Sequence, residues 1–257
     1  MTVAYNPMRL DGKRVLVTGA SSGIGRACAL CAARLGATVV LTGRRAAALE
    51  ETRAQLPEPS VHRVIPGDLA AAAFVSELPG LATADGPLDG FVHAAGVCAA
   101  MPIGVVGETQ LAASLQVNYS AFMLLMKQFS KKKFANQGFS AVAVSSVSAA
   151  AGWPGGALYA GSKGALSAAV RALALELAPK GMRVNAVCPS HIRTPLLAAL
   201  AGSPLSEPSV LASLAAKQPL GLGEPEQVAT AVCFLLGGAA SFITGVNLPV
   251  DGGYLAE

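Results

Sequence analysis

The stretch RVLVTGASSGIG, residues 14–25, decides the fold of this chain. Its first five residues form an apolar, β-branched run, and the glycines after them open a segment of helical periodicity that ends near Gly36. A glycine-rich turn between a buried strand and a helix is where doubly wound folds bind phosphate, because the helix N-terminus presents free N–H groups. Gly19 then permits the tight turn, Gly23 lets the backbone approach a pyrophosphate, and Gly25 lets the helix pack closely.

The same alternation continues along the chain. Strands that are apolar on both faces, separated by amphipathic helices, predict a parallel sheet covered on both sides. The predicted strands are 14–18, 38–42, 61–65, 91–95, 141–146, 183–188 and 245–250, and the predicted helices lie near 23–36, 46–56, 70–78, 108–133, 159–177 and 225–236. We therefore expect one α/β domain over residues 1–257, a doubly wound parallel sheet, with residues 194–223 as a substrate flap over the active-site edge.

Composition narrows the class of protein. The chain has 257 residues, of which 53% are hydrophobic, and a net charge of +4, which indicates a folded domain with a large core. No apolar run approaches the roughly 20 residues of a membrane span, and the N-terminus lacks a signal pattern. The positive charges are scattered apart from Lys131, Lys132 and Lys133, without interleaved aromatic residues. We expect a cytoplasmic protein that binds neither membranes nor nucleic acid.

Cys28 and Cys31 form a CxxC pair within the first predicted helix. A redox CxxC opens a helix, whereas the start of this helix is occupied by glycines, so we interpret the pair as small buried hydrophobic residues. No second CxxC or CxxxH follows, and His62 and His191 are interpreted as ordinary polar residues. The sequence therefore predicts no metal site.

The end of the second strand indicates which dinucleotide is bound. An NAD site places Asp or Glu there to bind the ribose hydroxyls, but this chain has Gly43 followed by Arg44 and Arg45. A guanidinium beside a small residue suits a 2′-phosphate. The residues favour NADP(H) over NAD(H); the alternative is a pair of solvated arginines at the start of a helix.

The stretch ALYAGSKGA, residues 157–165, sets Tyr159 and Lys163 one helical turn apart. Bringing a phenol from its ordinary pKa of ~10 to ~7 requires about 4 kcal/mol of stabilisation of the phenolate. An ammonium at ~4.5 Å supplies roughly 0.9 kcal/mol in bulk water and about 3.7 kcal/mol at an effective dielectric constant of ~20. We expect the pair to be reactive only inside a closed cleft.

Taken in order, these motifs resemble the short-chain dehydrogenase/reductase family over nearly the whole chain. The matching positions are Thr18 to Gly25, Asp68, Leu69, Ala94 to Gly96, Asn118, Ser146, Tyr159, Lys163, Pro189, Ile192, Thr194 and Val250 to Gly253. The resemblance implies that Tyr159 is the general acid and base and that Ser146 binds the substrate oxygen. It also implies that Lys163 binds the nicotinamide ribose and lowers the pKa of the tyrosine, and that Asn118 holds a water.

The resemblance further implies an NADP(H) site. The expected cofactor-binding residues are Gly19, Ser21, Ser22, Gly23, Ile24, Gly25, Arg44, Arg45, Asp68, Leu69, Ala95, Gly96, Asn118, Tyr159, Lys163, Pro189, Ile192 and Thr194. Among these, Asp68 is expected to bind adenine and Thr194 to contact the carboxamide or a phosphate. The chain departs from the family's usual pattern twice, with His93 in place of an asparagine and Ser190 in place of a glycine. We expect His93 to be structural and Ser190 to narrow the nicotinamide pocket.

The implied reaction interconverts a ketone and a secondary alcohol by hydride transfer. Because Glu207 and Lys217 are the only ionisable residues of the flap, we expect an apolar or thioester-linked ketone. A resemblance to 3-oxoacyl carrier-protein reductases makes an acidic carrier protein a candidate partner for residues 131–133 and Lys180. Hydroxysteroids, sugar-derived substrates and small secondary alcohols stay open, as does a non-catalytic dinucleotide sensor. The resemblance also implies a homotetramer through the long helices and the C-terminus around Tyr254.

Overall fold

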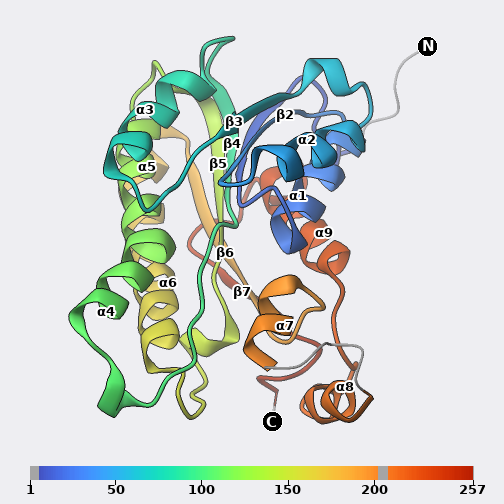
Figure 1. The fold of residues 1–257 in the computed structure, drawn as a ribbon. Coiled ribbons are helices and arrows are strands. Elements are labelled where there is room, and N and C mark those ends of the chain that lie inside the picture. The colour runs from blue at the N-terminus through green and yellow to red at the C-terminus, as the bar shows by residue number, and fades with distance from the viewer. Residues whose placement is uncertain (1–5, 202–207, 257) are drawn as a thin grey trace.

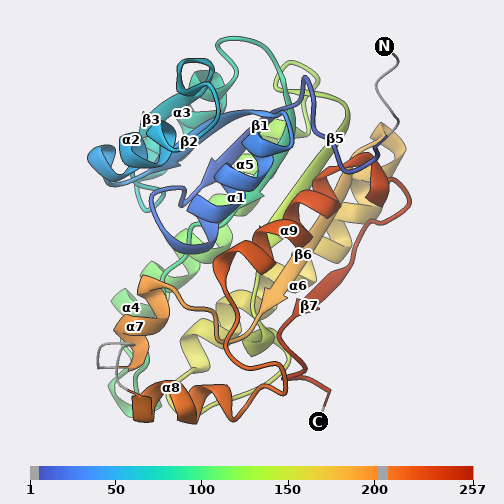
Figure 2. The same ribbon diagram turned by 90° about the vertical axis from the view of Figure 1, so that its right-hand side faces the viewer.

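The computed structural model describes residues 6–201 and 208–256 of the chain (Figures 1 and 2). In this part of the chain, seven parallel strands form one sheet in the order β3-β2-β1-β4-β5-β6-β7. The strands are β1 (Arg14–Thr18), β2 (Thr38–Gly43), β3 (Arg63–Pro66), β4 (Leu88–His93), β5 (Ala135–Val144), β6 (Arg183–Pro189) and β7 (Asn247–Val250). The strand order reverses between β1 and β4, so the predicted doubly wound fold is confirmed.

Helices cover both faces of the sheet (Figure 1). Their bounds are α1 (Gly23–Arg34), α2 (Ala46–Ala54), α3 (Ala72–Ala82), α4 (Glu108–Leu115), α5 (Ala121–Phe129), α6 (Ala157–Leu177), α7 (Pro195–Ala201), α8 (Pro208–Ala215) and α9 (Pro225–Leu236). Helices α1 and α9 pack on one face through small residues, and α3, α5 and α6 pack on the other around four fully buried phenylalanines, Phe91, Phe122, Phe129 and Phe139. Cys28 is buried in the first layer and Cys31 packs against it, so their interpretation as core residues is confirmed.

The third strand begins two residues later than predicted. A 3-10 turn over Pro59–Val61 precedes it, and the side chain of His62 takes the place of a strand partner. The His62 Nδ1 atom accepts a hydrogen bond from the Val39 N–H at 3.0 Å, and Nε2 donates to the Pro57 carbonyl at 2.7 Å. His62 is therefore a structural residue, in agreement with its interpretation as ordinary.

The predicted helix 108–133 is interrupted and shorter. Helix α4 leads into a π-helical turn at Gln116–Ser120, and α5 continues from there to Phe129. Because a π turn contains one extra residue, it displaces the backbone locally and brings Asn118 to a fully buried position. Elsewhere the predicted strands 91–95 and 141–146 each end two residues too late, and α3 runs through Pro79 beyond the predicted end.

The flap supplies α7 and α8, which lie beyond the carboxyl ends of β6 and β7 (Figures 1 and 2). Residues 202–207, including Glu207, lie outside the described part of the chain. No helix among the described residues is long and apolar enough to cross a bilayer.

Candidate functional site

A cavity of about 1050 Å³ runs along the carboxyl ends of the strands, from the glycine loop to the flap. Every residue predicted for the site lines it except Asn118: Gly19, Ser21, Ser22, Gly23, Ile24, Gly25, Arg44, Arg45, Asp68, Leu69, Ala95, Gly96, Ser146, Tyr159, Lys163, Pro189, Ile192 and Thr194. The fold therefore brings together residues that are up to 175 positions apart, counting from Gly19 to Thr194.

The glycine loop has the shape that a pyrophosphate requires. Gly19 adopts a φ of 68°, and a Cβ there would lie 2.8 Å from the Ala95 nitrogen. A Cβ on Gly25 would overlap the Gly19 carbonyl oxygen, so α1 packs directly on the loop, as predicted. The first turn of α1 contains no acidic residue, which leaves its positive N-terminus free to face an anion. The loop fits a dinucleotide.

Three further residues of the predicted site, Arg45, Asp68 and Thr194, make the following contacts. Arg45 donates from Nη2 to the Ser21 Oγ at 3.4 Å, which places this guanidinium at the end of β2 beside the loop. Asp68 accepts a hydrogen bond from the Ala70 N–H at 2.9 Å. Thr194 lies against the loop, because a Cβ on Gly23 would come within 3.2 Å of its Cγ2 methyl group. Of the two contacts predicted for Thr194, this position favours the phosphate.

Ser146, Tyr159 and Lys163 meet where the loop after β5 approaches α6. The Ser146 Oγ accepts the Ser148 N–H at 3.1 Å and donates to the Pro189 carbonyl at 3.4 Å. The Lys163 side chain is buried, and its Nζ lies 5.7 Å from the centre of the Tyr159 ring. Its ammonium donates to the Val144 carbonyl at 2.8 Å.

Burial dominates the protonation of Tyr159 and Lys163. Burial raises the pKa of Tyr159 above its ordinary value, the Cys98 thiol raises it further, and a hydrogen bond with Ser146 lowers it. Burial also lowers the pKa of Lys163 to about 8. Burial is the dominant effect on both groups, and the lowering of the phenol pKa by Lys163 in a closed cleft stays a prediction. At neutral pH, Tyr159 is a protonated phenol that can donate its proton.

Asn118 lies behind the cavity wall. Its Oδ1 accepts the Val97 N–H at 2.8 Å, and its Nδ2 donates to the Val97 carbonyl and to the Ser162 Oγ, each at 2.9 Å. A Cβ on Gly96 would lie 3.3 Å from Asn118 Oδ1 and 3.4 Å from Lys163 Nζ. Asn118 thus holds the Gly96–Val97 backbone, and the contact with a water stays a prediction.

The neighbouring serines are committed to local contacts. Ser145 donates to the Lys163 carbonyl at 3.1 Å and shares a hydrogen bond with Ser167 at 2.7 Å. The Ser148 Oγ accepts the Trp153 indole N–H at 3.2 Å. These contacts support the choice of Ser146 as the substrate-binding serine.

The two departures from the family pattern have local explanations. His93 is fully buried between Thr18 and the Val117 carbonyl, and burial lowers its pKa to about 3, so it is neutral and cannot act as a base at neutral pH. The Ser190 hydroxyl donates to the Asp251 carbonyl at 2.9 Å and so ties the end of β6 to the C-terminal segment.

Sequence reasoning missed five residues that line the cavity on the Ser146 side: Cys98, Trp153, His191, Lys217 and Tyr254. They belong to five separate loops, and none forms a motif with a neighbour in sequence. The proximity of His191 to the Pro189 motif was the one available signal. Among the described residues, no group of three or more His, Cys, Asp or Glu side chains could hold a metal ion.

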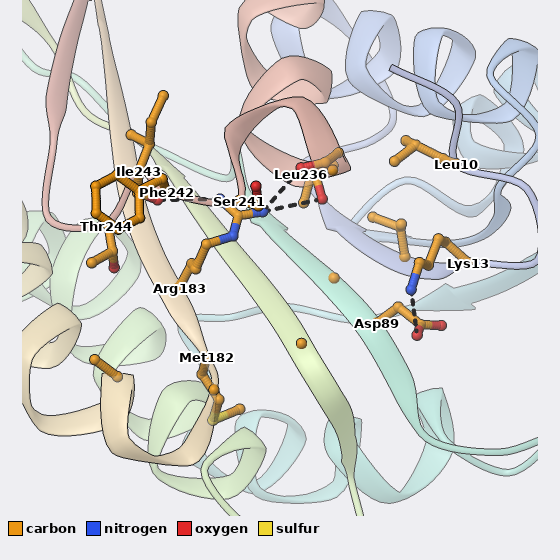
Figure 3. Close-up of a pocket in the computed structure, with 17 residues that line it drawn as sticks. Leu10, Lys13, Asp89, Met182, Arg183, Leu236, Ser241, Phe242, Ile243 and Thr244 are labelled. Carbon is orange, nitrogen blue, oxygen red and sulfur yellow. Dashed lines mark hydrogen bonds and ion pairs between the residues drawn. The ribbon is translucent and has the colours of Figure 1, made fainter. Parts of the chain in front are cut away.

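A second cavity, of about 570 Å³, lies at the amino ends of the strands, opposite the first cavity (Figure 3). Its charged side chains are held by the protein itself: Lys13 pairs with Asp89 at 3.5 Å, and Arg183 donates to the carbonyls of Leu236 and Gly237 at the end of α9. A cation at a helix C-terminus satisfies carbonyls that lack helical partners. We therefore assign these charged side chains a structural role.

Comparisons with known proteins agree with the geometry of the larger cavity. The sequence model of a family described as enoyl-(acyl carrier protein) reductase matches residues 19–255. The chain is 36% identical to a glucose 1-dehydrogenase of Gluconobacter oxydans, over 95% of this chain and 92% of that one. It is also 36% identical to a cis-4-hydroxycyclohexanecarboxylate dehydrogenase of Sinomonas cyclohexanicum, over 94% and 96% of the two chains.

Among solved structures, a protein of Beutenbergia cavernae described as an NAD(P)-dependent gluconate 5-dehydrogenase, with NADP bound at low occupancy, superposes with a TM-score of 0.88. It is 33% identical and covers 98% of this chain and 100% of its own. The chain therefore belongs to the short-chain dehydrogenase/reductase family. Within that family it is an oxidoreductase, an NAD(P)-dependent dehydrogenase or reductase.

Proposed function

We propose that this protein interconverts a secondary alcohol and a ketone with NADP(H), using Ser146, Tyr159 and Lys163 at the reaction centre and Asn118 behind it. The observation that carries the proposal is one cavity that is lined both by the glycine loop and by Ser146, Tyr159 and Lys163, of which Ser146 and Lys163 are buried. The nicotinamide, when bound, supplies or accepts the hydride. Residues 194–223 act as the flap of this one domain, since Leu196, Leu197, Leu200 and Leu214 line the cavity.

The protein's own residues handle the proton. In ketone reduction, the Tyr159 phenol donates its proton to the carbonyl oxygen, and the Ser146 hydroxyl hydrogen-bonds the same oxygen. The buried Lys163, whose Nζ lies next to Gly96, would bind the ribose hydroxyls of the cofactor. A positive charge near the phenol favours its ionised form. Alcohol oxidation needs the phenolate as the base, so it depends on the positive charge that the bound cofactor would add to this site.

Replacing Tyr159 with Phe tests the proposed reaction. We expect kcat to fall by about 10²- to 10⁴-fold, because the proton donor is lost. NADPH binding, followed by its fluorescence, should change little. Tyr119→Phe, outside the cavity, serves as the control and should keep its activity. Unchanged turnover by the Tyr159 variant would refute the assigned role.

The preference for NADP(H) rests on the guanidinium groups at the end of β2. Arg44 and Arg45 line the cavity beside Ser21 at the end of β2, and Asp68 follows the neighbouring strand β3. Replacing both arginines with Ser should raise KM for NADPH by about tenfold and change KM for NADH far less. Arg53→Ser, on the outer face of α2, is the matched control. Equal effects on the two cofactors would contradict the preference.

For the substrate, we favour a small or sugar-derived secondary alcohol over a carrier-linked thioester. The relatives named above act on a sugar and on a hydroxy acid. Residues 131–133 and Lys180 lie after α5 and α6, at the amino ends of β5 and β6, on the edge of the sheet opposite the cavity. A carrier protein docked there would be remote from Tyr159, so this basic cluster does not support the thioester reading.

We also propose a homotetramer. Strand β7 is an edge strand, and Phe242, in the loop before it, is fully exposed. Leu175 on α6 is 78% exposed, and Leu124 on α5 is exposed as well. Exposed apolar residues on two separate surfaces and an unpaired strand edge fit two interfaces between identical subunits.

A further inference from the structure

The cavity extends past Ser146 into a region formed by the end of β6, the flap and the C-terminal segment. His191 follows Pro189, whose carbonyl accepts the Ser146 hydroxyl at 3.4 Å. Its ring meets that of Tyr254 edge-on, with centroids 5.6 Å apart. This region, defined here as the distal region, is lined by His191, Lys217 and Tyr254 and belongs to the same cavity as Ser146, Tyr159 and Lys163.

Lys217 is brought to His191 by its neighbour in the chain. The side chain of Gln218 is 3% exposed, and its Oε1 accepts the His191 N–H at 2.7 Å. Its Nε2 donates back to the His191 carbonyl at 3.4 Å. This reciprocal pair fixes the backbone of the flap against the end of β6, so that Lys217 lines the distal region beside His191.

The charge of Lys217 is not balanced by the described residues. Within residues 6–201 and 208–256, its ammonium forms no ion pair. Asp68 is the one acidic residue in the described lining of the cavity, and it lies at the end of β3 with the proposed adenine contacts. The distal region therefore has a positive charge beside the reaction centre.

His191 adds hydrogen-bonding capacity to this charge. Burial and the nearby Lys217 lower the pKa of the imidazole, so the ring is neutral at neutral pH and carries one N–H. Its buried Nδ1 has no hydrogen-bond partner among the described residues. A neutral imidazole beside an ammonium offers one N–H and one cation, which suits an anion of single charge.

We infer that His191 and Lys217 bind a carboxylate on the substrate, so that the enzyme acts on a hydroxy acid or the corresponding keto acid. The inference rests on the proposed function and names its substrate class. A carboxylate fits better than a phosphate, since phosphate sites are built from several donors, commonly Arg forks or helix N-termini. This inference revises the expectation of an uncharged ketone, which rested on the flap sequence without its folded position.

Matched substrates test the inference. Oxidation of 4-hydroxycyclohexanecarboxylate is compared with that of its primary amide, and reduction of the 4-oxo acid with that of the 4-oxo amide, using both cofactors. We expect kcat/KM to favour the acids by about 10- to 100-fold, mostly through KM, since hydrogen bonds to charged groups are worth that much. Equal turnover of acid and amide, or turnover of neutral sugars with no preference for any acid over its amide, would overturn the inference.

Variants connect the preference to Lys217. Lys217→Met should remove most of the preference for the acid, because kcat/KM for the acid falls far more than kcat/KM for the amide, and Lys217→Arg should retain the preference. Lys180→Met, on the opposite edge of the sheet, is the matched control. If Lys217 only balances the C-terminal dipole of α8, the Met variant will melt at a lower temperature and keep the wild-type preference for the acid, which refutes the inference.

Two further outcomes are distinguishable. A stronger preference for a hydroxyalkyl phosphate over both the acid and the amide would refute the choice of carboxylate. Failure to turn over any secondary alcohol or ketone with either cofactor would instead refute the proposed function, and the inference with it.

Discussion

His93 connects three parts of the molecule through one neutral ring. Because the Val117 carbonyl can only accept, the Nε2 atom at 3.1 Å must carry the proton, and Nδ1 then accepts from the Thr18 hydroxyl at 3.2 Å. The Thr18 Oγ1 in turn accepts the Ala95 N–H at 3.1 Å. This chain of hydrogen bonds joins the ends of β1 and β4 to the π turn that contains Asn118.

The buried ring makes folding sensitive to acid. Its folded-state pKa of about 3 lies below the ordinary value of 6.5, so the unfolded chain binds a proton first as the pH falls. This contribution to stability is complete above pH 6.5 and is lost as the pH falls toward 3. Between pH 7 and 5, the wild type should lose about 2 kcal/mol more unfolding free energy than His93→Asn, measured in urea. Parallel losses in the two proteins would contradict a neutral buried ring.

Residue-level chemistry was predictable where it depends on local spacing. Tyr159 and Lys163 are one helical turn apart in any helix, and the structure places both in the cavity. The pKa of Tyr159 was not predictable, because it depends on how completely the surrounding chain buries the phenol. His191 and Lys217 were missed because Gln218, a long-range contact, brings them together.

At the scale of single elements, α1 can pack closely on the glycine loop because Gly25 has no side chain. Gly25 lies in its first turn, directly against the Gly19 carbonyl, so the helix N-terminus points into the cavity at close range. In α6, by contrast, Gly161 has open space around it. Replacing each of these two helical glycines with alanine should therefore change the free energy of unfolding in opposite directions.

Gly25→Ala and Gly161→Ala form a matched pair. We expect the first to lower the free energy of unfolding by about 1–3 kcal/mol through overpacking and to weaken NADPH binding. The second should raise the free energy of unfolding by about 0.5–1 kcal/mol, because alanine favours the helix. Thermal melting and NADPH titration measure both effects. Unaltered NADPH affinity in Gly25→Ala would show that the contact does not shape the site.

Element boundaries marked the limit of prediction from hydrophobic patterns. The pattern over residues 108–133 gave a helix, but not the π turn at Gln116–Ser120, because one inserted residue barely changes the apolar periodicity. Likewise, the hydrogen-bonded contact of the His62 ring with the Val39 N–H could not be predicted from the pattern of apolar residues.

At the scale of the whole molecule, the order of the strands determines which strands lie at the edges of the sheet. Among the described residues, the sheet ends at β3 on one side and at β7 on the other. Phe242, which precedes β7 and lines the second cavity, is fully exposed in the described part of the chain (Figure 3). The doubly wound fold could be predicted from alternating segments, but an exposed phenylalanine is visible only after folding.

Phe242→Lys should shift the protein from the proposed tetramer to smaller assemblies. Placing a charge in an apolar contact removes the burial that favours association. Light scattering after size exclusion gives the mass of each assembly. Val61→Lys, at another exposed apolar position, should leave that mass unchanged. A tetramer of undiminished stability in the Phe242 variant would place the interface elsewhere.

Two separate parts of the sequence supply the two groups of residues that line the cavity. The glycine loop, Arg44, Arg45 and Asp68 all precede residue 70, whereas His191, Lys217 and Tyr254 all follow Pro189. On the two proposals above, the arginines that would select the coenzyme and the residues that would select the substrate are encoded in different stretches of the gene. Recombination with a related gene just after the codon for Pro189 should yield hybrids that inherit the coenzyme of one parent and the substrate of the other.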